Sequence, residues 1–518
     1  MPYSRLPHGV VIAISLFFAF FLNLWGVPLF DLDEGAFAEA TREMLASGNF
    51  AATYLDGRPR FDKPILSYWF QAVSVSIFGL NEWALRLPTA IASSLWLLAT
   101  YRFVKQFWDE QSALITVMIM ANTLWIGMIG RAAIADGWLN LFIALAMFDI
   151  HRYFHRPERG VILRTFLWLG LGVLTKGPVA VLIPLLTAGV FFVLRQRTRQ
   201  LLSALLHPLG WAVLALTVLP WAYLVYRDQG ADFFYGFIVE HNLHRFSSTR
   251  EGHGGSLFYY FLVLPLILLP FSGGLLVLLR NVKTLWQDSR NQFLLLWFAV
   301  VFVLVSFSQT QLPHYVLYGA TGLLILLSTQ RALLFRQQWH FVLPALFFAL
   351  MIGLPFLVEI AATQSHRAYE KEMLSLGTSV FDAWYYALSL LVASVVLAIY
   401  LRFKQHVWQS LIAIGAIQTL FVFNLLIDKV ADIQQQPVKQ AALFARQHHL
   451  DDVVAYGINM PSFSVYREQI TPKREPAPDD VIFTRADRLD KLSSIYQPAS
   501  IDILYERGGI LLVRLEHE

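Results

Sequence analysis

The sequence contains no cysteine, and only 15% of its residues are charged. Without cysteine, disulfide bonds and thiolate metal sites are excluded. The chain is 56% hydrophobic and has 41 phenylalanines, a composition that excludes a soluble globular protein. It shows no nucleotide-binding signature and no internal repeat, and a formal net charge of +4 gives no reason to expect a nucleic-acid partner.

The sequence does contain many long apolar runs. They approach the roughly 20 residues that a helix needs to cross the hydrocarbon core, whereas membrane strands alternate over about ten. We therefore predict an all-α polytopic membrane protein. The first run lacks a small-residue cleavage site, so we interpret it as a retained span and not as a signal peptide. Thirteen spans are expected, at residues 9–30, 84–103, 111–129, 132–150, 161–175, 178–194, 208–226, 257–279, 293–308, 315–329, 341–360, 384–401 and 409–427.

The loops between these spans alternate in charge. Every second loop is rich in Lys and Arg, and short loops of this kind stay in the cytoplasm. From a cytoplasmic N-terminus, an odd number of spans places the C-terminal segment outside. The basic residues are Arg102, Lys105, Arg152, Arg156, Arg159, Arg164, Arg195, Arg197, Arg199, Arg280, Lys283, Arg290, Arg331, Arg336, Arg402 and Lys404.

The opposite, outer face carries the longer loops. In the first of them, residues 34–47 and 64–79 are typical of amphipathic helices at the membrane interface. From about residue 430 the hydropathy falls, and four short strand-like segments surround a helix at 437–449. We predict a transmembrane domain followed by a small extracytoplasmic α/β domain. The loops are 31–83, 227–256, 309–314 and 361–383, and the two domains are 1–429 and 430–518.

Polar residues gather at the outer ends of the spans, where they can share one cavity. Charges near membrane depth are costly and usually face a cavity or a partner. The candidates are Asp33, Glu34, Asp62, Lys63, Arg131, Asp136, Lys176, Glu240, His241, His244, Arg245, His253, His314 and Tyr315.

Structural roles compete with functional ones for these residues. Asp33 or Glu34 would suit the cap of a following helix, and Lys63 would suit a pair with a neighbouring acid. Arg245 has a similar alternative in Glu240. The histidines are scattered without the tight spacing of a metal site, so a divalent metal at the outer face is a weakly supported alternative, and no cofactor is required.

Several motifs in this order resemble the aminoarabinose transferase family of C-type glycosyltransferases, whose wider relatives include protein O-mannosyltransferases. The resemblance covers about residues 9 to 427. It implies a bacterial inner-membrane enzyme that takes a sugar from a polyprenyl phosphate and passes it to a periplasmic acceptor. The motifs are "DEGAFAEATREMLASGNF", "RFDKPILSYW", "VLTKGP", "VEHNLHRF" and "QLPHYVL".

The resemblance also implies roles for single residues. Asp33 and Asp136, with Glu34 beside them, correspond to the acids of the catalytic cavity. The ligands of the carrier phosphate correspond to Lys63, Arg245 and Tyr315. Further cavity residues are expected at Asp62, Arg131, Lys176, His253 and His314. Two departures stand out, because Asp62 replaces a frequent Glu, and Gln309 and Gln311 replace frequent lysines.

The chemistry fits a lipid-phosphate donor. Lys63 and Arg245 would neutralise the charge that grows on the departing phosphate, without a metal clamp. A carboxylate near the anomeric carbon would stabilise its positive charge, and a hydroxyl acceptor would also need a base. Asp33 suits either role. If the acceptor is a phosphate, which is already anionic, Asp33 would instead orient a sugar amine or stabilise the sugar cation.

We therefore predict an integral-membrane glycosyltransferase that uses undecaprenyl phosphate as carrier. The expected acceptor is lipid A of the lipopolysaccharide, and the expected sugar is aminoarabinose or a similar one. The same chemistry with a different sugar and a glycan or protein acceptor is the alternative. A transporter would be expected to show internal repeats and charges near span centres. A non-catalytic lipid-binding protein is the remaining rival, and transfer activity would exclude it.

Overall fold

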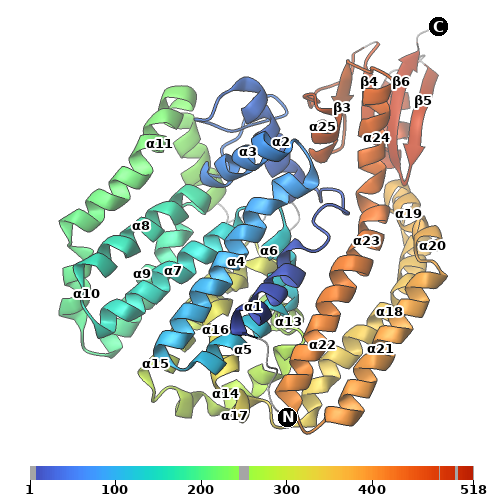
Figure 1. The fold of residues 1–518 in the computed structure, drawn as a ribbon. Helices are drawn as coiled ribbons and strands as arrows, with labels where there is room; N and C mark the ends of the chain where they lie inside the picture. Colours follow the sequence, from blue (N-terminus) through green and yellow to red (C-terminus); the bar gives the residue numbers. More distant parts are fainter. Residues whose placement is uncertain (1–6, 244–255, 478, 496–499, 517–518) are drawn as a thin grey trace.

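The computed structural model describes residues 7–243, 256–477, 479–495 and 500–516. A bundle of helices fills most of the molecule, and a small sheet near the C-terminus lies at the end opposite the described N-terminus (Figure 1). The main helices of the bundle are α1 (His8–Leu16) with η1 (Phe17–Phe21), α4 (Glu82–Phe107), α5 (Glu110–Ala121), α6 (Leu124–Arg131), α7 (Asp136–His155), α8 (Arg159–Lys176), α9 (Val179–Leu194), α11 (Pro208–Phe234), α13 (Tyr259–Ile267), α14 (Gly274–Leu285), α15 (Ser289–Ser306), α16 (Leu317–Thr329), α18 (Val342–Gln364), α21 (Ala383–Phe403) and α22 (Val407–Phe421).

The bundle belongs to a multi-pass membrane protein. Within the described residues, five helices are long and apolar enough to cross a bilayer, or six if the bent pair α5 and α6 forms one span. Large apolar side chains also face outward, such as Leu262 and Trp384, which are 79% and 73% exposed. Lipid is the environment that such outward apolar surfaces require. The count of thirteen crossings stays a prediction.

Two expected spans are bent or broken, and the helix that contains a third is interrupted just beyond it. The pair α5 and α6 turns by 71°. Between α13 and α14 the chain passes through Pro270, which lacks a backbone N–H and cannot continue a helix. Gly230 interrupts α11 with a φ of 65°, a left-handed conformation that glycine adopts without strain.

The first long loop forms a compact layer at one end of the bundle. It contains α2 (Asp33–Ser47), the hairpin of β1 (Tyr54–Leu55) and β2 (Arg58–Pro59), and α3 (Leu66–Phe78). Helix α2 ends at Gly48, whose φ of 68° is the usual left-handed stop. In Figure 1 this layer lies at the same end of the bundle as the C-terminal sheet.

The predicted C-terminal sheet is present, and it has four strands in the order β3-β4-β6-β5. Strands β3 and β4 are parallel, whereas β4–β6 and β6–β5 are antiparallel. Helix α24 packs against the sheet through apolar side chains such as Val438 and Ala442. The elements are α23 (Ile427–Gln434), α24 (Gln436–Gln447), β3 (Val453–Ala455), α25 (Ser462–Arg467), β4 (Val481–Arg485), α26 (Leu489–Ile495), β5 (Ser500–Arg507) and β6 (Ile510–Glu516).

Helix α25 attaches this C-terminal unit to the first loop. The backbone N–H of Ser462 donates to Asp31 at 3.0 Å, and its hydroxyl donates to the other carboxylate oxygen. The Tyr466 hydroxyl accepts from the N–H of Leu29 at 2.7 Å and donates to Glu82 at 3.0 Å. These contacts fix the short segment that leads into α2.

Candidate active site

Two cavities lie near the end of the bundle that carries the first loop. The larger has a volume of about 400 Å³ and is lined by Asp33 and His314; we name it the Asp33 cavity. The smaller, of about 120 Å³, is lined by Lys63, Lys176 and Tyr315; we name it the Lys63 groove. His314 and Tyr315 are neighbours in the short helix η4 (Pro313–Val316). That one turn therefore supplies a residue to each cavity.

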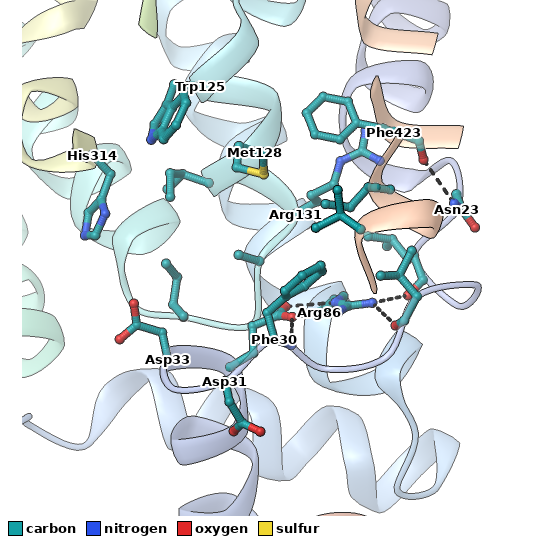
Figure 2. Close-up of a pocket in the computed structure, with 18 of the residues that line it drawn as sticks. Asn23, Phe30, Asp31, Asp33, Arg86, Trp125, Met128, Arg131, His314 and Phe423 are labelled. Atoms are coloured by element: carbon teal, nitrogen blue, oxygen red, sulfur yellow. Dashed lines mark hydrogen bonds and ion pairs between the residues drawn. The ribbon is translucent and has the colours of Figure 1, made fainter. Parts of the chain in front are cut away.

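Asp33 is the first residue of α2, and its side chain is exposed to the cavity. Within the described part of the chain its carboxylate has no hydrogen bond or ion pair, so it does not cap the helix through a hydrogen bond. Figure 2 shows Asp33 and His314 on the same side of the cavity, one above the other in this view, whereas Asp31 points away from it.

Glu34 is occupied by structural partners. Its two oxygens accept from Arg86 at 2.8 and 2.6 Å, and the N–H groups of Ala133 and Phe30 donate to it at 2.7 and 3.0 Å. Burial alone would raise the pKa of Glu34, but Arg86 and the two N–H groups bring it below its ordinary value. This geometry favours a role in holding the Asp33 turn against α4 over direct catalysis.

The motif around Lys63 contains a buried ion pair. Arg60 donates to both oxygens of Asp62, at 2.5 and 3.0 Å, and its guanidinium lies 5.3 Å from the ring centre of Phe37. It also donates to the backbone carbonyl of Ala36, on the first turns of α2. Burial would raise the pKa of Asp62, but Arg60 and then Lys63 hold it well below its ordinary range. Arg60 thus links helix α2, which begins at Asp33, to the segment that carries Lys63.

Asp136 lies at the start of α7, between the two cavities. Its Oδ1 accepts from Lys176 at 2.7 Å and from the Tyr318 hydroxyl at 2.5 Å, and it lies 3.5 Å from Nε2 of His314. Lys176 reaches this point because α8 ends at Gly177, where a φ of 85° permits the turn into α9. A buried carboxylate with so many donors is fixed in place.

The Lys63 groove combines apolar walls with charged residues. Its walls are formed by Val179, Leu182, Ile183, Phe237, Leu304 and Val305. Lys63, Lys176 and Asp62 also line it, and the Lys176 ammonium is 5.0 Å from the ring centre of Tyr315. A groove of this kind suits an anionic group attached to an apolar chain.

Arg131 lines the Asp33 cavity, but its guanidinium donates hydrogen bonds mainly to backbone carbonyls of the first helix. It donates to the carbonyls of Phe18, Ala19, Leu22 and Gly127, at 3.2, 2.5, 2.9 and 3.2 Å. Its guanidinium also lies 3.8 Å from the ring centre of Phe423. The cation therefore satisfies backbone carbonyls in and directly after η1, together with one of α6.

Part of the expected site lies outside the described residues, namely His244, Arg245 and His253. His241 is described and lines the Lys63 groove. Among the described residues, no group of three or more His, Asp or Glu side chains is arranged to hold a metal ion.

Sequence reasoning missed three residues that organise the site. Arg60 stands two positions before Asp62, and Tyr318 three positions after Tyr315, so both were near enough to the motifs to be noticed. Tyr318 lies one helical turn from Tyr315, on the same face, and this spacing was the available signal. Arg86 gave no signal, because a single arginine early in a span has no local pattern that names its partner.

Comparisons with known proteins found a matching family model and similar sequences. Residues 62–223 match a family model described as dolichyl-phosphate-mannose-protein mannosyltransferase. The chain is 29% identical over 392 residues to the undecaprenyl phosphate-alpha-4-amino-4-deoxy-L-arabinose arabinosyl transferase of Aeromonas salmonicida, across 72% of this chain and 70% of that protein.

Two solved structures share the fold. The crystal structure of ArnT from Cupriavidus metallidurans bound to undecaprenyl phosphate has a TM-score of 0.78 and 19% identity, across 98% of this chain and 97% of that chain. The oligosaccharyltransferase of Archaeoglobus fulgidus in the apo form has a TM-score of 0.52 and 13% identity, across 91% of this chain and 65% of that one.

Proposed function

Because the chain belongs to the aminoarabinose transferase family of C-type glycosyltransferases, we propose that it moves a sugar from undecaprenyl phosphate, or a similar polyprenyl phosphate, to lipid A. The reaction takes place at the periplasmic face of the bacterial inner membrane, and the sugar is aminoarabinose or a similar one. The N-terminus is cytoplasmic and thirteen spans place the C-terminal α/β domain, 430–518, in the periplasm beside the membrane domain, 1–429.

One observation carries this proposal: neighbouring residues of η4 line two cavities of different chemistry, His314 the Asp33 cavity and Tyr315 the Lys63 groove. The Lys63 groove has apolar sides and contains two lysines, as a lipid-linked phosphate requires. The Asp33 cavity offers a carboxylate and an imidazole. A transferase needs its donor and acceptor to meet at one point, and in this proposal they meet beside η4.

The donor phosphate lies, in this proposal, beside the lysines of the Lys63 groove. Lys63 neutralises the negative charge that increases on the phosphate as the sugar departs, and Arg245 and Tyr315 are its further ligands. Lys176 lines the same groove, and its ammonium is held by Asp136 at 2.7 Å. In the low-dielectric groove, such fixed cations stabilise a leaving phosphate without reorganisation.

The acids have distinct roles in this proposal. Asp33 faces the reacting sugar and stabilises positive charge at the anomeric carbon as the bond to phosphate breaks. Asp136 acts through Lys176, Tyr318 and His314, because its oxygen is occupied by those groups. Glu34 is a positioning residue that holds the Asp33 turn through Arg86.

Binding and transfer by Lys63→Ala test the proposal. The purified protein in detergent is given undecaprenyl phosphate, and its affinity is measured beside the turnover of a synthetic undecaprenyl-phosphate sugar. Losing one partner of a buried charge pair costs about 2 to 5 kcal/mol, so binding should weaken at least tenfold. Lys105→Ala, at an exposed lysine paired with Glu110, is the matched control. Normal binding and transfer by Lys63→Ala would move the phosphate site elsewhere.

A further inference from the structure

Helices α18 and α21 form an antiparallel pair at one side of the bundle (Figure 1). The ring of Phe341, in the short helix η5 (Gln338–Phe341) that leads into α18, lies 5.2 Å from the ring of Tyr400 near the end of α21. The Tyr385 hydroxyl, near the start of α21, donates to the carbonyl of Met351 at 2.7 Å. Only 28% of the most apolar stretch of η5 and α18, and 11% of that of α21, is buried. Both helices therefore face mainly lipid.

An apolar groove runs between these two helices. Its volume is about 350 Å³, which is within the range of small-molecule sites. Ala345 and Ala349 of α18 and Ala393 of α21 line it, and such short side chains leave the space between the helices open. Gln338 and Tyr400 add an amide and a hydroxyl at the end where α18 begins and α21 ends. The groove thus has apolar walls and polar groups at one end.

Three cations lie at that same end. The residues of α21 that line the groove recur at helical spacing, and Lys404 follows the last of them, Tyr400, by four residues. Residues four apart share a helix face, and Lys404 keeps helical dihedral angles, with φ −56° and ψ −17°. Arg402 is in the last turn of α21, and Arg336 lies just before η5. All three side chains are exposed.

These cations have no anionic partner within the part of the chain that the structure describes. One nitrogen of Arg336 donates to a backbone carbonyl at 2.7 Å, but Arg336, Arg402 and Lys404 form no ion pair with a described residue. In another predicted cytoplasmic loop, by contrast, Arg290 pairs with Asp288 at 2.6 Å. Orientation in the membrane requires basic loops, but it does not require an apolar groove beside them. Together the two features are complementary to a lipid with an anionic headgroup.

We propose that this groove binds one acyl chain of an anionic phospholipid, and that Arg336, Arg402 and Lys404 hold the phosphate of its headgroup. Gln338 and Tyr400 then donate to oxygens between the phosphate and the chain. Because basic loops stay in the cytoplasm, the lipid belongs to the cytoplasmic leaflet, whose anionic lipids clusters of Lys and Arg attract. The site lies at the end of the bundle opposite the first loop (Figure 1), so the inference does not depend on sugar transfer.

The chemistry of the groove separates this occupant from its rivals. A zwitterionic phospholipid fits the apolar walls equally well, but it carries an amine that the three cations repel. A free phosphate ion would meet the cations and leave the apolar walls uncovered. Retention should therefore need both an acyl chain and a net negative headgroup.

Native mass spectrometry of the full-length protein, after detergent has removed loosely bound lipid, tests the headgroup. The probes are dioleoyl phosphatidylglycerol and dioleoyl phosphatidylcholine, added in equal amounts, and the wild type should retain mainly the first. Each basic residue near an anionic headgroup contributes about a fivefold preference, so Lys404→Gln should reduce the preference about fivefold, and Lys404→Gln with Arg402→Gln further. Arg199→Gln is the matched control, because Arg199 is exposed in α10 (Thr198–Leu205), on the other side of the bundle (Figure 1).

The same measurement tests the acyl chain. Ala349→Trp should abolish retention of phosphatidylglycerol because the indole fills the groove, and Ala393→Leu should weaken it from the facing helix. Leu350→Trp is the control, since Leu350 is 50% exposed but does not line the groove. Equal retention of the two lipids by the wild type would overturn the inference. Unchanged retention in both groove variants, or a second copy of the chain in place of the lipid, would also overturn it.

Discussion

Arg60 donates hydrogen bonds to both carboxylate oxygens of Asp62, at 2.5 and 3.0 Å, directly before Lys63 in the chain. The pair occupies an acid that would otherwise neutralise the neighbouring ammonium, which lies 3.5 Å from the same carboxylate. Arg60 is suited to this because its planar group binds both oxygens at once and lies near the rings of Phe37 and Tyr68.

Arg60→Met should therefore raise the donor KM about tenfold or more, because Asp62 then pairs more closely with Lys63 and neutralises its charge. Loss of one partner of a buried pair should also lower the free energy of unfolding, by about 3 to 5 kcal/mol. Arg60→Lys should restore activity only in part, since lysine does not bind both oxygens. Arg58→Met, at an exposed arginine of the same hairpin, is the control. An unchanged donor KM in Arg60→Met would show that the Arg60–Asp62 pair does not contribute to donor binding.

Asp33→Asn should lose transfer but not stability. Asn caps a helix about as well as Asp, and Asp33 makes no hydrogen bond within the described residues, so the melting temperature should be unchanged. Turnover should fall about a hundredfold or more, because the charge near the anomeric carbon is lost. Glu34→Gln is the contrasting variant: it breaks the charge balance with Arg86 and should lower the melting temperature. Full turnover by Asp33→Asn at unchanged stability would return Asp33 to a structural role.

Burial of the Asp31 carboxyl should make stability depend on pH. Burial raises the pKa of Asp31 from 3.8 to about 7, against the hydrogen bonds from Ser462. The folded protein then binds this proton more tightly than the unfolded chain, so the stability is complete below about pH 4 and is lost as the pH rises to 7. Between pH 5 and 8 the melting temperature of the wild type in detergent should fall more than that of Asp31→Asn. An equal fall in both proteins would contradict this.

The proposed orientation makes a prediction about the two ends of the bundle. A reporter that is active only outside the cytoplasm should be active when fused after Glu518, and inactive when inserted at 195–200, where the loop after α9 leads into α10 (Thr198–Leu205). In Figure 1 this loop lies at the end of the bundle opposite the C-terminal sheet. An active reporter at 195–200, or an inactive one at the C-terminus, would contradict the proposed orientation and would place the site at the cytoplasmic face.

The sequence predicted the fold class and the motifs because both depend on local patterns. Apolar runs of span length identify helices whatever their neighbours, and the alternation of strand-like segments identified the C-terminal sheet. It did not predict which charges pair, because Glu34 meets Arg86, and Asp136 meets Tyr318, only after the chain has folded. The assignment of Glu34 beside Asp33 shows this limit: two adjacent acids read alike in the sequence, but one is bound by an arginine and the other faces a cavity.

The sequence also did not predict where the helices bend. The turn of 71° between α5 and α6 falls at Asn122 and Thr123, and two polar residues within an otherwise apolar stretch do not by themselves predict such a bend. That turn carries Arg131 to the carbonyls of the first helix, a role that no local pattern announces. Tertiary contacts, not composition, decide which polar residues of a membrane protein line a cavity and which satisfy its backbone.

Mass spectrometry of lipid A and of the polyprenyl-phosphate pool, from cells with and without this protein, tests the central claim most directly. If the protein transfers a sugar from the lipid carrier to lipid A, its removal should leave that sugar on the polyprenyl phosphate and remove the same mass from lipid A. Expression of the wild type, but not of Asp33→Asn, should reverse both changes. Identical pools in the two kinds of cell, with every sugar mass of lipid A retained, would contradict the claim.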